Sequence, residues 1–110
     1  MMPEDDTPEI YDIRFSEPAE AELEMEYLRL AGIRFELAER WNEGILTACQ
    51  SLSQLPKRYP LALDKMKGGY QTRRMPFRIG PMGYSILSAV FELAESDPAF
   101  VRVLHIRRNV

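Results

Sequence analysis

The sequence predicts a two-layer α+β domain, in which an antiparallel helical hairpin packs on one face of a mainly antiparallel β-sheet (β-α-α-β-β-β). Two stretches with helical periodicity, 16–32 and 34–55, follow a short alternating stretch. Three strand-like stretches come next, separated by turn residues. Helices followed by a run of strands are typical of α+β folds. The 110 residues suffice for one modest core, so we expect a single domain over residues 10–110.

The N-terminal part of the chain is predicted to be a tail followed by a strand. Residues 1–9 contain two prolines, four acidic residues and no apolar pattern, which predicts a flexible acidic tail. In residues 10–16 (IYDIRFS), three apolar side chains alternate with two charged ones. This alternation predicts a short strand with one apolar face, formed by Tyr11, Ile13 and Phe15.

The first helix is predicted to begin after Ser16, a good N-cap, with Pro18 in its first turn and Gly32 as its left-handed C-terminal cap. Its apolar residues form two stripes on opposite sides. The first stripe comprises Ala19, Leu23, Tyr27 and Leu30, and the second comprises Ala21, Met25 and Leu28. A helix that is apolar on two sides has two neighbours, so the second stripe is expected to contact a partner.

The second helix is predicted over residues 34–55, where apolar residues recur every three or four positions. This seam comprises Ala38, Trp41, Ile45, Ala48, Leu52 and Leu55. The short link to the first helix predicts an antiparallel hairpin. Gly44 costs helix stability and is expected to allow a close neighbour. Cys49 lies beside the seam and is expected to be a small buried hydrophobe.

The three later strands are predicted over residues 70–77, 84–93 and 100–108, as an antiparallel meander. Pro81 is expected at position i+1 of the first turn, and Asp97-Pro98 supplies the second turn. Pro76 favours an edge position for the first of the three strands. On the last strand, strict alternation places Leu104 and Ile106 in the core with Arg102 and Arg108, and places Val101, Val103, His105 and Arg107 on the other face.

Charge is distributed unevenly along the chain, whose formal net charge is −3. Residues 1–55 hold four arginines against thirteen acids, a balance of −9, and residues 56–110 hold ten basic residues against four acids, a balance of +6. This asymmetry predicts two surfaces with different partners. Arginines beside a histidine can either stabilise charge on a scissile phosphate or bind an acidic partner. The residues alone do not distinguish these two roles.

The composition argues against several function classes. One histidine and one cysteine are too few for a zinc site, so no metal or other cofactor is expected. The sequence has no glycine-rich phosphate loop and no nucleophile-elbow pattern. It contains no run of about 18 apolar residues, and its acidic start is unlike a secretory signal. We therefore expect a cytoplasmic protein with no membrane partner.

Four local motifs occur in a fixed order within this predicted fold. They are Ala38-x-x-Trp41 on the second helix, the turn from Leu52 to Pro56, Arg73-Arg74 on the next strand, and VRVLHIRR over residues 101–108. In this order, over residues 10–109, they resemble the RelE/ParE superfamily of bacterial toxins from toxin–antitoxin, or plasmid-stabilisation, modules.

The resemblance implies a type II growth-inhibiting toxin that a cognate antitoxin neutralises. RelE-like members cleave mRNA on the ribosome, whereas ParE-like members carry a longer helical hairpin and are associated with inhibition of DNA gyrase. Gln71 and Ser85 stand where RelE-like members often have a lysine and an arginine. Together with the long hairpin, they favour the ParE-like branch and a binding mechanism.

The resemblance also suggests three groups of functional residues. A catalytic set, in the manner of histidine-using relatives, would comprise His105, Arg73, Arg74 and Arg107. A target-binding basic face would comprise Arg73, Arg74, Arg78, Arg107 and Arg108. The stripe formed by Ala21, Met25 and Leu28 would bind the antitoxin or a second copy of the chain. A ribosome-dependent endonuclease and a non-toxic protein-binding relative remain the alternatives.

Overall fold

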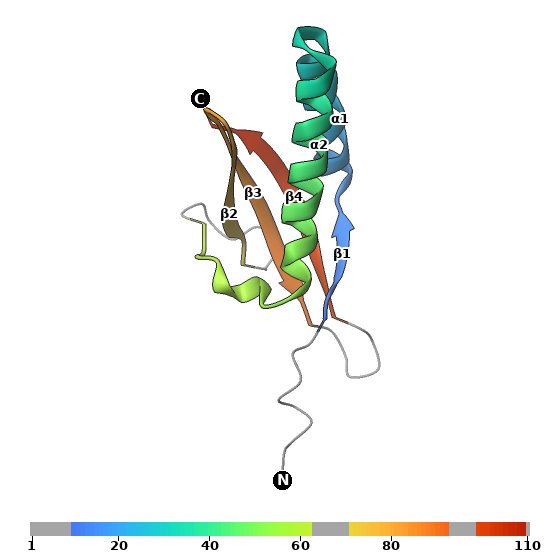
Figure 1. The fold of residues 1–110 in the computed structure, drawn as a ribbon. Helices are drawn as coiled ribbons and strands as arrows, with labels where there is room; N and C mark the ends of the chain where they lie inside the picture. Colours follow the sequence, from blue (N-terminus) through green and yellow to red (C-terminus); the bar gives the residue numbers. More distant parts are fainter. Residues whose placement is uncertain (1–9, 63–70, 93–98, 110) are drawn as a thin grey trace.

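The computed structural model describes residues 10–62, 71–92 and 99–109. The predicted tail over residues 1–9 and the turn residues Asp97 and Pro98 lie outside the described residues. The elements are β1 (Asp12–Phe15), α1 (Glu17–Ile33), α2 (Phe35–Gln50), the 3-10 turns η2 (Ser51–Ser53) and η3 (Pro56–Arg58), β2 (Arg73–Ile79), β3 (Met82–Phe91) and β4 (Phe100–Arg108). The predicted α+β order is confirmed (Figure 1).

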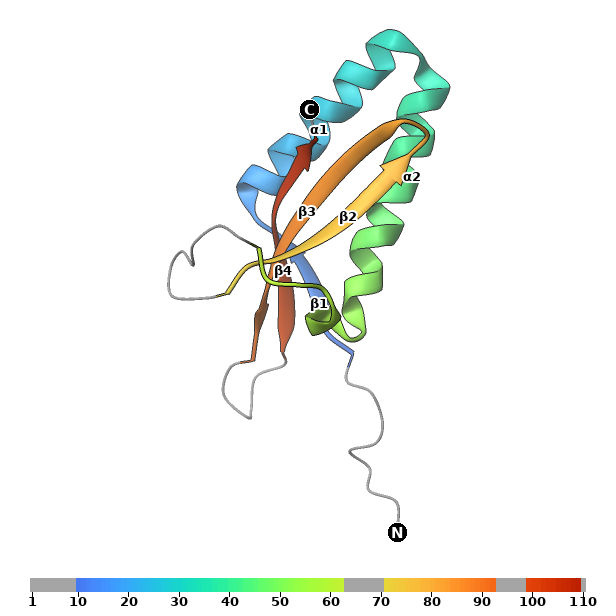
Figure 2. The ribbon, with the colours of Figure 1, turned by 90° about the vertical axis from the view of Figure 1, so that its left-hand side faces the viewer.

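The four strands form one sheet in the order β1-β4-β3-β2. Strands β2, β3 and β4 form the predicted antiparallel meander, whereas β1 runs parallel to β4, so the sheet is mixed. Pro76 lies on β2, an edge strand as predicted. The helical hairpin covers one face of the sheet, and we call the opposite face the open face (Figure 2).

Helix α1 begins as predicted, because the Ser16 hydroxyl oxygen accepts the Ala19 N–H at 3.1 Å and a proline lies in the first turn. The predicted role of Gly32 is wrong. The helix continues to Ile33 and ends at Arg34, an extended residue whose N–H donates to the Leu30 carbonyl at 2.8 Å. Because one extended residue reverses the chain, α2 starts at once and no left-handed residue is needed.

The core lies between the hairpin and the sheet. The first predicted stripe of α1 faces it, with Ala19 and Leu30 fully buried. The predicted seam is buried at Ala38, Trp41 and Ile45 of α2 and at Leu52 of η2, and Cys49 is buried beside it. The sheet contributes Met75, Tyr84, Ile86, Val101, Val103 and Ile106. The prediction for Leu55 is wrong: α2 ends at Gln50, and Leu55 is 66% exposed in a left-handed conformation (φ 51°).

Gly44 allows a close approach between α2 and β2, as expected. A Cβ atom at this position would lie 3.0 Å from the Cζ atom of the Phe77 ring. A helical alanine would therefore press on a side chain that packs against the core.

The turn between β2 and β3 differs from the prediction. Ile79 pairs with Met82, so the two central residues are Gly80 and Pro81. Gly80 has a positive φ of 57°, which two-residue hairpins commonly require at their first central position. Pro81 is therefore at position i+2, and the glycine before it supplies the left-handed conformation.

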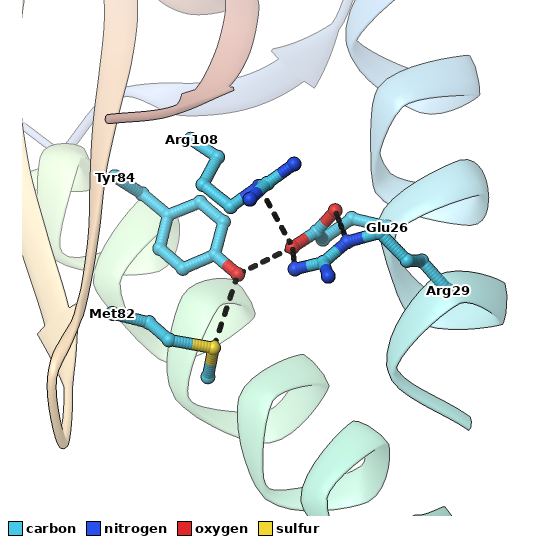
Figure 3. Close-up of polar contacts among 5 residues, drawn as sticks. All are labelled: Glu26, Arg29, Met82, Tyr84 and Arg108. Carbon is cyan, nitrogen blue, oxygen red and sulfur yellow. Dashed lines mark hydrogen bonds and ion pairs between the residues drawn. The ribbon is translucent and has the colours of Figure 1, made fainter. Parts of the chain in front are cut away.

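A polar cluster joins the hairpin to the sheet (Figure 3). The Tyr84 hydroxyl of β3 donates to Oε2 of Glu26 on α1 at 2.5 Å, and Arg29 donates to both Glu26 oxygens. Arg108 Nε lies 3.9 Å from the same carboxylate. Burial alone would raise the pKa of Glu26, but the hydrogen bonds from Arg29 and Tyr84 and the nearby positive charges outweigh it and lower that pKa. Glu26 of α1 therefore remains charged while it contacts Tyr84 of β3 and Arg108 of β4.

Candidate functional site

The open face of the sheet is strongly basic. Residues paired across neighbouring strands point to the same face, so the pairing register assigns each strand residue to a face. The arginines on the open face are Arg14, Arg74, Arg78, Arg102 and Arg107. Among the described strand residues, Asp12 is the acid that shares this face. Such a surface attracts polyanions or acidic partners.

A β-bulge in β4 determines which residues of the last strand reach this face. Leu87 pairs with His105 and Ser88 pairs with Val103, so Leu104 is an extra residue. The prediction of strict alternation is therefore wrong for the first half of the strand. Val101 and Val103 are buried in the core and Arg102 lies on the open face. After the bulge Ile106 faces the core, and Arg107 faces outward as predicted.

The start of α1 holds this bulge. Two successive carbonyl groups, of Val103 and Leu104, accept hydrogen bonds from the Ser16 N–H (2.9 Å) and the Ser16 hydroxyl (2.8 Å). Further along α1, Oε1 of Glu22 accepts a hydrogen bond from the Ile106 N–H at 2.8 Å. Residues at the start of α1 thus form hydrogen bonds with the backbone groups at the edge of β4, beyond the point where its pairing with β1 ends.

His105 is held at this same edge. Its Nδ1 atom lies 3.1 Å from Glu22 Oε2. An ionised carboxylate accepts hydrogen bonds but cannot donate them, so Nδ1 of His105 carries the proton of this bond. In the neutral ring, Nε2 is then left as an acceptor. His105 is therefore oriented by α1 at the border of the open face, with a side chain that is 33% exposed.

Arg74 and Arg107 line a groove of about 560 Å³ on the open face. The Arg74 Nε donates to Ser85 Oγ at 2.8 Å, and the Ser85 hydroxyl donates to Asn109 Oδ1 at 3.0 Å. Arg74 is thus fixed through one nitrogen, and the structure shows no described partner for its two terminal nitrogens. Leu61 and Leu87 supply apolar surface to the same groove. The groove combines two cations with an apolar wall.

A second arginine cluster lies at the other end of the open face, and the sequence reasoning missed it. Arg14 pairs in register with Arg102. The Arg14 guanidinium lies 4.0 Å from the centroid of the Phe100 ring, and that of Arg102 lies 5.4–5.5 Å from the Phe100 and Phe91 centroids. The two rings stack at 4.9 Å. The alternation in residues 10–16 did indicate that Arg14 points away from the core.

Two predicted site residues do not belong to this face. Arg73 is on the helix side, where its Nη1 donates to the carbonyl groups of Lys57 (3.2 Å) and Tyr59 (2.8 Å). Arg108 borders the groove, but it pairs with Tyr84 and lies beside Glu26. Arg78 is on the open face beyond the groove, where its Nη2 donates to the Pro81 carbonyl at 3.4 Å. Of the predicted catalytic set, the structure brings His105, Arg74 and Arg107 to one face.

The second apolar stripe of α1 points away from the core. Met25 is 70% exposed and Leu28 is 61% exposed, and Ala21 is exposed as well. No described residue packs over this stripe to bury it. The stripe and the open face are thus two separate candidate binding surfaces.

No protein-family model matches the sequence, and no curated protein matches it significantly. Among the described residues, neither helix is long and apolar enough to cross a membrane.

Proposed function

We propose that this protein is the toxin of a type II toxin–antitoxin module, of the ParE-like branch of the RelE/ParE superfamily. It acts in the cytoplasm and inhibits growth by binding a macromolecular target, such as DNA gyrase, through the open face of its sheet. The residue motifs that resemble this superfamily support the assignment, as does the β-α-α-β-β-β order.

The observation that carries the proposal is the open face itself. Five arginines from three of the four strands, β1, β2 and β4, point to one face, against one described acid on the strands. Arg73, which a catalytic set would need there, is used instead to hold backbone carbonyls on the helix side. A face with many arginines and few groups able to transfer protons favours binding over cleavage.

A cognate antitoxin would neutralise this face. An acidic segment that covers Arg74 and Arg107 would both cancel the charge and fill the groove with its apolar side chains. The groove's apolar residues, Leu61 and Leu87, give such a segment a contact beyond charge. Toxin and antitoxin would then form a hetero-oligomer.

The test is inducible expression in bacteria, followed by growth measurement and a gyrase supercoiling assay with the purified protein. We expect growth arrest and loss of supercoiling with the wild-type chain. Arg74→Gln/Arg107→Gln should relieve both effects, because it removes the two groove cations. Arg34→Gln/Arg40→Gln, which changes the same charge at exposed hairpin positions, should remain toxic. Unaffected growth with the folded wild-type chain would refute the proposal.

One observation favours a second candidate, a ribosome-dependent mRNA endonuclease. Glu22 orients His105 so that Nε2 is an acceptor at the border of the arginine face, a suitable arrangement for a general base. In a translating extract this candidate predicts mRNA cleavage that His105→Gln abolishes. Cleavage that survives the substitution would exclude His105 as the base, and a chain with neither activity would be a non-toxic binding relative.

A further inference from the structure

We propose that the acidic outer face of α1 binds the arginine groove of a second copy of this chain, so that the protein associates head to tail. This inference goes beyond the proposed function, because it concerns self-association and requires neither toxicity nor a target. It rests on two unpartnered surfaces of opposite charge that lie in different layers of the same molecule.

The first surface is the outer face of α1. Residues three and four apart on a helix are neighbours, so the apolar stripe of Ala21, Met25 and Leu28 runs beside a row of acids. These acids are Glu17, Glu20 and Glu24, all of which are exposed. The face therefore presents carboxylates directly beside apolar side chains.

The second surface is the groove, which has the matching pattern. Arg74 and Arg107 supply the positive charges, and Leu61 and Leu87 supply the apolar surface. Seating Met25 or Leu28 in the groove would bring Glu20 and Glu24 to the two arginines. Charge and apolar surface are thus complementary in the same contact.

The two surfaces cannot meet within one molecule. The hairpin covers one face of the sheet (Figure 2), and the groove is lined by residues of the opposite, open face. Packing α1 against α1 of a second copy would instead oppose two rows of acids, which is unfavourable. The contact is therefore heterologous, and a heterologous contact either closes a ring or extends an open chain.

The association should be weak and sensitive to salt. One helix face in one groove makes a small interface, of the kind seen in transient complexes, and we expect a Kd on the order of 10–100 µM. Raising the salt from about 0.1 M to about 1 M shortens the Debye length from ~10 Å to ~3 Å. This change should dissociate the complex.

The experiment uses two full-length variants that each lack one surface, studied by sedimentation velocity at low salt. Glu20→Gln/Glu24→Gln removes the acids and keeps the groove, and Arg74→Gln/Arg107→Gln does the reverse. Circular dichroism checks that both variants fold. We expect wild type to show concentration-dependent association, each variant alone to be monomeric, and their mixture to form a 1:1 dimer.

A matched control separates this contact from bulk charge. Glu36→Gln/Glu43→Gln makes the same charge change at exposed positions of α2 and should associate like wild type. The proposal is overturned if wild type stays monomeric at low salt, if the mixed variants do not dimerise, or if the control dissociates as fully as the α1 variant. Association of the Glu20→Gln/Glu24→Gln chain with itself would equally refute it.

Discussion

Tyr84→Phe tests the polar link between the hairpin and the sheet. The substitution removes one oxygen atom from a side chain that is 1% exposed and leaves its contacts with the Trp41 and Phe77 rings in place. The substitution removes the 2.5 Å hydrogen bond to Glu26, whose side chain is 14% exposed, and the weaker 3.9 Å contact with Met82 Sδ. Glu26 keeps its hydrogen bonds from Arg29, so it is not left unpaired.

The expected loss in free energy of unfolding is about 1.5–2 kcal/mol at pH 7, because hydrogen bonds to charged groups contribute about 1.5–3 kcal/mol. For a domain of this size, each kcal/mol lowers Tm by roughly 4–8 °C. Urea unfolding followed by circular dichroism measures the free energy. Tyr27→Phe is the matched control, because its hydroxyl bonds to the Glu39 carboxylate at the exposed surface, and its loss should be below ~0.5 kcal/mol.

The cost should also depend on pH in a defined direction. The pKa of Glu26 is lowered in the folded protein from an ordinary value of 4.5, so its pairing stabilises the fold above that value. The stabilisation is lost as the pH falls through the folded pKa. The difference between wild type and Tyr84→Phe should therefore be full at pH 6–7 and shrink below about pH 4. Equal losses for the Tyr84 and Tyr27 variants, or a cost independent of pH, would refute this account.

Three further predictions concern the core. Gly44→Ala should not yield the ~1 kcal/mol gain in free energy of unfolding that helix propensity offers, because its Cβ would lie 3.0 Å from Phe77; in a Phe77→Leu background the same change should become stabilising, and purely additive effects in this double-mutant cycle would contradict the contact. Cys49 should react with thiol reagents at pH 8 only as fast as the protein unfolds, since burial raises the pKa of its thiol to about 12; rapid labelling of the native chain would count against it. The buried indole N–H of Trp41 has no partner among the described residues, so Trp41→Phe removes no hydrogen bond and should cost well below the ~3–5 kcal/mol of truncating a core aromatic residue to alanine; a loss that large in thermal melts would contradict this.

Local rules predicted most of the fold. Ser16, Pro18 and the first stripe of α1 follow from capping preferences and helical periodicity, and these rules need only neighbours in sequence. Gly44 was recognised because a glycine inside a helix costs stability unless something lies close to it. Pro76 indicated an edge strand because it lacks an N–H group.

The predictions for β4 and Arg73 were wrong for a different reason, because they depend on contacts between residues far apart in the sequence or on different strands. At the bulge, Ser16 donates hydrogen bonds to the Val103 and Leu104 carbonyls. Ser16 is 88 residues away from Leu104 in sequence, so no pattern within β4 reveals these contacts. The same bulge moved Arg102 to the open face and the two valines to the core. The prediction placed Arg73 and Arg74 on the same face. Adjacent residues on a strand point to opposite faces, so only one of the two arginines could lie on the open face.

The outer edge of β2 limits how any partner can approach. The N–H of Arg74 is already bound to the Pro60 carbonyl, the Thr72 carbonyl to Ala62, and Pro76 has no N–H to offer. A foreign strand aligned there would find few backbone donors, so the sheet resists growing into a longer ladder with neighbouring molecules. Pairing of this edge with a strand of another molecule is therefore disfavoured, and recognition of other molecules at this edge has to use side chains.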